Sequence, residues 1–147
     1  MIKKWCVLLL LISLLTGCRQ TKPADAIQLD DLPKVTVEID GQSFKTARGS
    51  YCWNTGNMGM CADASGNPFD YESKAPPIEV ASKEQIKLHF TEQPLSFSVE
   101  ITKDDDHDFV ADKAEFSAPE NPGMYGYTVS TNWKQGDIVF HFILLVK

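Results

Sequence analysis

Two cysteines, two methionines and a tryptophan lie within eleven residues, YCWNTGNMGMC, at positions 51–61. The four sulfur atoms belong to Cys52, Met58, Met60 and Cys61. Two thiols can form a disulfide or a redox couple, and thiolate and thioether sulfurs are soft ligands that favour Cu(I). The choice depends on the compartment, because disulfides persist outside the reducing cytosol and are rare within it.

The first residues of the chain indicate the compartment. Lys3 and Lys4 precede an apolar run over residues 5–15, which is typical of an export signal. The run is shorter than the roughly 20 apolar residues that cross a bilayer. Leu15, Thr16, Gly17 and Cys18 follow in an order that resembles the lipobox of bacterial lipoproteins. The resemblance implies cleavage after Gly17, a diacylglyceryl group on Cys18, and a location on the extracytoplasmic face of the cell membrane.

The net charge limits which classes of partner are expected, and the chain length limits the number of domains. Removal of residues 1–17 takes away two lysines and no acid, which leaves 12 basic and 20 acidic residues and a net charge of −8. This charge argues against nucleic acid as a partner and against a polybasic grip on anionic lipid. We expect a signal peptide at 1–17, a lipidated tether at 18–33 and one folded domain at 34–147.

Export would leave Cys52 and Cys61 as an even pair in a compartment that permits disulfides. The sequence predicts a structural disulfide between them, and the Asn and Gly residues between the two cysteines let a short loop turn back. A soft-metal site, with copper on Cys52, Met58, Met60 and Cys61, or a redox site is the alternative. It lacks a nearby histidine and a Cys-x-x-Cys pattern, and we expect no cofactor.

Alternating apolar and polar residues predict an all-β domain. Period two extends over 35–39, 86–90 and 95–101, and Asp40-Gly41 is a strong hairpin signal. Residues 138–146 are apolar on both faces, which predicts a central strand. Only Pro68 to Tyr71 suggests a helical turn. About seven strands joined by polar turns predict a two-sheet sandwich.

The residues that lead into the penultimate strand resemble the tyrosine corner of immunoglobulin-like domains. There Tyr125 would bond back to nearby backbone, and Tyr127 stands where such a domain carries its second core cysteine. The architecture is therefore expected to be immunoglobulin-like without the inter-sheet disulfide. A looser resemblance to small lipoproteins of Bacillus-type bacteria rests on residues 116–119, Gly123, Trp133 and Phe140. It covers about residues 34–147 and implies no catalytic residue.

The histidines and acids do not form a familiar catalytic pattern, so we do not expect an enzyme. His89 is expected at the surface, His141 within the last strand, and His107 in the acidic stretch 104–108. That stretch could offer oxygen ligands to calcium, but its spacing does not match an EF-hand, and a solvated turn is the expectation.

A long connection is the remaining candidate for recognition. Residues 53–77 form a stretch of about 25 residues, and connections of that length are functional or disordered. Trp53, Phe69 and Tyr71 lie there among polar residues, a mixture suited to binding an envelope protein. The alternative is that these aromatic side chains fold back onto the sandwich.

Overall fold

The computed structural model describes residues 27–104 and 106–147. The expected signal peptide, the lipobox with Cys18, and the tether up to residue 26 lie outside the described residues. Within them no helix is long and apolar enough to cross a membrane.

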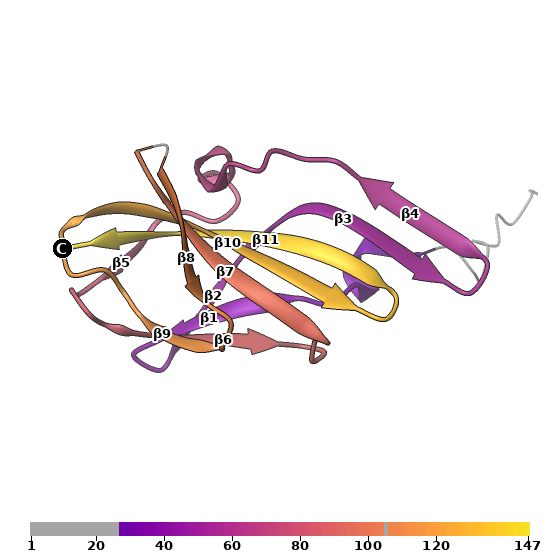
Figure 1. Ribbon diagram of the computed structural model, residues 1–147, viewed down its shortest axis with the longest axis horizontal. Coiled ribbons are helices and arrows are strands. Elements are labelled where there is room, and N and C mark those ends of the chain that lie inside the picture. Colours follow the sequence, from indigo (N-terminus) through magenta and orange to yellow (C-terminus); the bar gives the residue numbers. More distant parts are fainter. Residues whose placement is uncertain (1–26, 105) are drawn as a thin grey trace, which may run out of the picture.

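The described chain is built from eleven strands and two short 3-10 turns (Figure 1). The 3-10 turns are η2 (Leu29–Asp31) and η3 (Pro68–Tyr71). The strands are β1 (Val35–Ile39), β2 (Gln42–Lys45), β3 (Ala47–Thr55), β4 (Met58–Ala62), β5 (Ile78–Val80), β6 (Gln85–Phe90), β7 (Ser96–Lys103), β8 (Asp106–Ala111), β9 (Glu115–Ser117), β10 (Gly123–Trp133) and β11 (Gly136–Val146).

The strands form two sheets that pack as a sandwich, as predicted. The smaller sheet has the order β2-β1-β6-β9, and the larger has the order β4-β3-β11-β10-β7-β8. The short β5 pairs in parallel with the end of β11. From β6 onward the order is that of the immunoglobulin fold: β6 and β9 take the places of strands B and E, and β7, β10 and β11 those of C, F and G.

The described chain has eleven strands where about seven were expected; the hairpin β1–β2 was predicted, and the hairpin β3–β4 was not. The hairpin β1–β2 extends the smaller sheet, and the hairpin β3–β4 extends the larger one. Asp40 and Gly41 form the turn of the first hairpin, both with positive φ (48° and 73°), as the Asp-Gly signal predicts. The short strands β5, β8 and β9 were also not expected.

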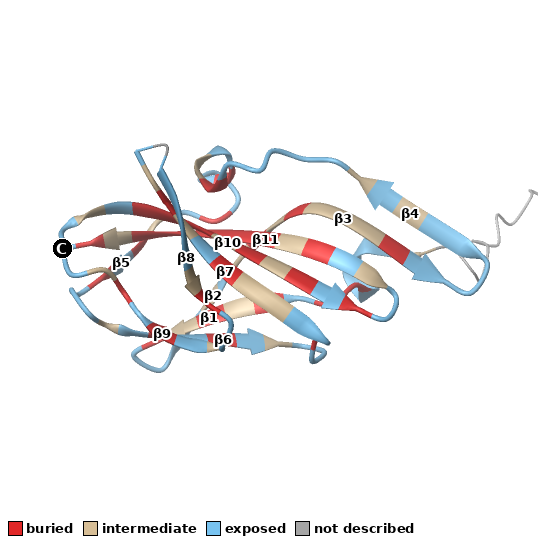
Figure 2. Ribbon diagram, viewed as in Figure 1, coloured by how far each residue is buried: buried red, intermediate tan, exposed pale blue. Residues whose placement is uncertain are grey.

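The core lies between the two sheets and consists of alternate residues of each strand (Figure 2). Period two places one residue in two on the inner face of each strand. Strand β11 is central, between β10 on one side and β3 and β5 on the other, as its two apolar faces predict. Tyr127 stands in the core in place of the cysteine and stacks on Phe142, with ring centroids 4.7 Å apart. Burial raises the pKa of the Tyr127 hydroxyl.

The packed region begins before residue 34. Leu32 is buried in the core, and Ile27 packs against the core from outside. Residues 27–33, predicted to belong to the tether, therefore pack with the domain.

Candidate functional site

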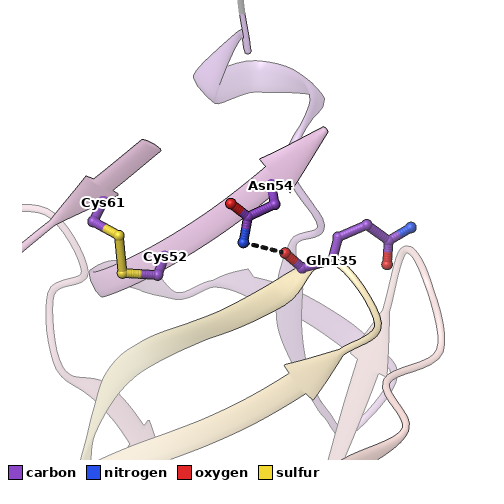
Figure 3. Close-up of a disulfide and its surroundings, with 4 residues drawn as sticks. All are labelled: Cys52, Asn54, Cys61 and Gln135. Carbon is purple, nitrogen blue, oxygen red and sulfur yellow. Dashed lines mark hydrogen bonds between the residues drawn. A yellow bond between two sulfur atoms is a disulfide. The ribbon is translucent and has the colours of Figure 1, made fainter. Parts of the chain in front are cut away.

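The sulfur-rich stretch folds into the hairpin β3–β4. Cys52 and Cys61 face each other across the two strands and are joined by a disulfide, with Cα atoms 4.1 Å apart (Figure 3). The predicted disulfide is therefore present. It closes a hairpin of the sheet and not a free loop.

The four sulfur atoms are divided between the two faces of this hairpin. Cys52 and Cys61 are directly opposite, whereas Met60 and Met58 are opposite Trp53 and Thr55. Because successive side chains of a strand point to opposite faces, the methionines lie on the face away from the disulfide. The set of four ligands that the copper alternative requires does not converge in this arrangement.

The hairpin is attached to the body through its neighbours. Asn54 donates from its backbone N and its side-chain Nδ2 to the carbonyl of Gln135, at 2.9 and 3.3 Å (Figure 3). Gly136 has φ of 155°, and a Cβ there would lie 1.9 Å from the carbonyl oxygen of Cys52. Only glycine allows β11 and β3 to approach this closely.

The prediction that Trp53 opens a surface loop is wrong. Trp53 lies in β3 with its side chain buried in the core, where its ring meets that of Trp133 edge to face at 5.7 Å. The predicted 25-residue connection therefore contains the end of β3 and the whole of β4. The part without strands is residues 63–77, which we call the covering segment.

The covering segment lies on the outer face of the larger sheet, over β10 and β11 (Figure 1). Its turn η3 begins at Pro68, which is buried, and the side chain of Asn67 accepts a hydrogen bond from the backbone N of Phe69 at 3.1 Å. Gly126 makes room for it, because a Cβ there would lie 2.3 Å from Cγ of Pro68. The segment thus packs closely on the sheet.

Tyr71 and Phe69 occupy different places in this segment. Tyr71 is buried, and its hydroxyl donates to the carbonyl of Ser65 at 2.7 Å. Burial, with a smaller effect of the Asp70 carboxylate, raises its pKa. Phe69 is only partly buried. Of the three predicted recognition residues, Trp53 and Tyr71 support the fold, and Phe69 retains an accessible surface.

His141 lies beneath Tyr71 on the outer face of β11. Its ring stacks on the tyrosine ring with centroids 4.5 Å apart and an interplanar angle of 19°. Nδ1 is 3.2 Å from the hydroxyl of Thr128, and Nε2 has no hydrogen-bond partner among the described residues. Burial lowers the pKa of His141 to about 4, so the ring is neutral at neutral pH.

A groove of about 350 Å³ lies between the covering segment and the hairpin β7–β8. Its lining residues are Gly66, Asn67, Phe69, Thr102 and His107. Nδ1 of His107 is 2.9 Å from the hydroxyl of Thr102 on the adjacent strand. The groove thus combines an aromatic surface with side chains that form hydrogen bonds.

The acidic stretch 104–108 contributes to this groove in a way that the sequence did not indicate. The turn of the hairpin includes Asp104, which has φ of 50°, and β8 already begins at Asp106. His107 is therefore a strand residue whose ring lines the groove. Phe109, two residues later, lies on the same face of β8 and is 64% exposed.

A second hollow of about 300 Å³ lies on the smaller sheet. Four carboxylates line it, from Glu38, Asp40, Glu84 and Glu115. Two of them are paired: Glu115 with Lys87 at 3.3 Å, and Glu38 with His89 at 2.8 Å. The exposed position expected for His89 is confirmed.

Tyr125 forms the contact that the tyrosine corner requires. Its hydroxyl donates to the carbonyl of Asn121 at 2.9 Å and accepts from Nζ of Lys103 at 3.2 Å. The bond to Asn121 spans four residues and closes the turn before β10. Tyr125 is therefore a structural residue.

Comparison with known proteins gives no further assignment. No protein family matches the chain, and a search of curated proteins found no significant match. Within the described residues, no group of three or more His, Cys, Asp or Glu side chains is arranged to hold a metal ion.

Proposed function

We propose that this protein is a lipid-anchored binding protein on the extracytoplasmic face of a bacterial cell membrane. The sequence of Leu15 to Cys18 supports the anchor, through its resemblance to a lipobox. The disulfide between Cys52 and Cys61 supports an oxidising compartment. Two acyl chains on Cys18 would provide the stable attachment that a single chain does not.

The binding surface in this proposal is the groove between the covering segment and the hairpin β7–β8, together with the exposed ring of Phe109. The carrying observation is that Phe69 and His107, 38 positions apart in the chain, line one hollow on the outer face of the larger sheet. Aromatic surface surrounded by hydrogen-bonding groups is typical of protein interfaces. The partner is an envelope protein.

Binding suits this groove better than catalysis. Among the described residues, its lining side chains offer one imidazole, one hydroxyl and one amide, and no carboxylate. The imidazole is paired with the hydroxyl of Thr102, and this hydroxyl belongs to a buried residue, which disfavours its attack on a substrate in the groove. We therefore assign the groove a role in recognition.

The anchor is tested by Cys18→Ala. The variant loses the thiol to which the diacylglyceryl group is attached, so the protein should leave the membrane fraction or persist as uncleaved precursor. Fractionation and the mass of the mature protein provide the readout. Normal processing with unchanged membrane retention would contradict lipidation.

The groove is tested by photo-crosslinking in intact cells. A photoreactive amino acid at Phe109 or at Asn67 should give an adduct with an envelope protein, and Phe69→Ala should weaken it because the aromatic wall is lost. Ser43 on the exposed strand β2 of the other sheet is the matched control. Equal adducts from Ser43 and Phe109, or none from the groove, would rule out this surface.

The mass and copper content of the purified mature protein distinguish the proposed binding function from the soft-metal alternative. A mature mass lower by two hydrogens than that of the dithiol, without copper, supports the disulfide-closed binding protein. Two free thiols with bound copper would favour the alternative, in which the hairpin opens and its four sulfur atoms rearrange.

A further inference from the structure

Exposed apolar side chains lie on three separate segments at one end of the sandwich. Of the five large hydrophobic residues that are most exposed in the described chain, three lie there: Leu29 (50%), Met58 (43%) and Leu95 (75%). They belong to η2, to the start of β4, and to the turn between β6 and β7. The other two, Phe109 and Met124, belong to β8 and to the opposite end of β10.

Hydrogen bonds hold the turns of this end together. The backbone N of Leu95 donates to the carbonyl of Asn132 at 2.8 Å, and Nε1 of Trp133 donates to the carbonyl of Glu92 at 3.1 Å. The turn β10–β11 is bonded in turn to the hairpin β3–β4 through Asn54, as described above. The end is therefore a continuous part of the fold, on the right in Figure 1.

The described chain also begins at this end. Ile27 packs against the core, and the backbone N of Lys34 donates to the hydroxyl of Thr91 at 2.9 Å, next to the turn that carries Leu95. Eight residues separate Cys18 from Ile27. The nine steps from Cys18 to Ile27 extend at most about 3.6 Å each, so the linker can span no more than about 32 Å.

Even fully extended, that reach does not exceed the length of the sandwich. Strand β11 runs from this end to the C-terminus, and its eleven residues correspond to about 35 Å. If Cys18 is lipidated, the end that carries Leu29 is therefore held near the bilayer, and the far end can reach it only when the whole domain lies down.

We propose that Leu29, Met58 and Leu95 form a contact surface for the lipid bilayer, so that the sandwich stands on the membrane with this end down. The inference rests on the lipid anchor of the proposed function. Exposed leucine and methionine side chains gain by leaving water for the interfacial region. The surface adds an orientation that an acyl anchor alone does not impose.

Charge does not assist this contact. Asp30 and Asp31 lie beside Leu29, and Glu92 and Asp137 lie in or next to the turns of this end. The lysines near it are Lys34, Lys45 and Lys134, so the described residues here carry no excess of positive charge. The contact is therefore apolar, and it should be no stronger on anionic lipid than on neutral lipid, in contrast to a basic membrane patch.

The experiment uses the full mature lipoprotein in phosphatidylcholine vesicles, with and without phosphatidylglycerol. An environment-sensitive fluorophore is placed on Leu29→Cys or Leu95→Cys, and Met124→Cys at the far end is the control of similar exposure. Spin-labelled lipid should quench the first two labels several times more strongly than the third. Adding Leu95→Glu to the Leu29→Cys protein should reduce that quenching.

The outcomes separate the two proposals. Protein that fails to float with the vesicles lacks its anchor, which overturns the proposed function. Protein that floats, but whose three labels are quenched equally or not at all, is anchored without this contact, which overturns the inference alone. Stronger quenching on phosphatidylglycerol would show an electrostatic contact and would also contradict it.

Discussion

His141 is a residue whose type conflicts with its place. It is fully buried on the outer face of β11, between the ring of Tyr71 and the backbone of β3. A Cβ on Gly49 would lie 2.6 Å from its Nε2, so any other residue at position 49 would displace the ring. The imidazole stays neutral here because a proton would place a charge on a fully buried side chain.

Acid should therefore weaken the fold through His141. Its pKa falls from 6.5 in the unfolded chain to about 4 in the folded one, so between these values the unfolded state binds more protons and stability rises with pH. The contribution is complete above about pH 6.5 and is lost as the pH falls toward 4. At pH 4.5 the loss amounts to roughly 2.5 kcal/mol.

Denaturant unfolding at pH 7 and pH 4.5 measures this effect. His141→Gln should show a smaller difference between the two pH values than the unchanged protein, since other titrating groups are common to both. An equal pH dependence of the two proteins would show that His141 does not titrate in this way.

At the scale of single residues, the sequence predicted the roles of residues whose partners lie close to them in the sequence. Tyr125 bonds to a carbonyl four residues away, and Cys52 and Cys61 are nine positions apart. The burial of Trp53 and His141 could not be predicted, because it depends on Trp133 and Tyr71, which the fold brings in from distant segments. The placement of His107 and Phe69 along one groove has the same origin.

The hairpin β3–β4 is the element that depends most on a covalent bond. Within the described sheet, β4 pairs only with β3, and its residues are mostly exposed (Figure 2). Such an edge strand gains little from burial. The disulfide fixes Cys61 of β4 opposite Cys52 of β3. It also stabilises the folded protein, because it restricts the unfolded chain.

Removing both cysteines should therefore destabilise the protein. The double variant Cys52→Ala and Cys61→Ala should lose about 2.7 kcal/mol, the entropy of closing a ten-residue ring. Met58→Ala, an exposed change in the same strand, is the matched control and should have little effect. Thermal or denaturant unfolding under oxidising conditions tests this; equal stability of all three proteins would contradict a stabilising disulfide.

At the scale of elements, strands with their own alternating pattern were predictable, and strands created by pairing were not. The alternation in β1, β6 and β7, the large residues on one face of β10, and the continuous apolar run in β11 are visible in the sequence. By contrast, β5 and β9 have three residues each and exist because β11 and β6 offer them partners. In β4 and β8, residues common in turns outweigh the weak strand signal.

For the whole molecule, the architecture separates two surfaces. The end with η2 and the turn that carries Leu95 lies to the right in Figure 1, whereas η3 and the turn β7–β8 lie toward the C-terminus. In the proposed orientation, the groove is held away from the lipid. The sequence predicted the sandwich and the anchor but not this polarity, because polarity depends on where the chain joins the folded body.

The central place of β11 also decides how the protein would respond to force. A partner that pulled on the C-terminus, while the N-terminus was held at a membrane, would load β11 along its length. The strand is hydrogen-bonded to β10 on one side and to β3 and β5 on the other. A force along β11 would therefore load all these hydrogen bonds at once, and they would not break one after another. This geometry suits a domain that must stay folded under tension.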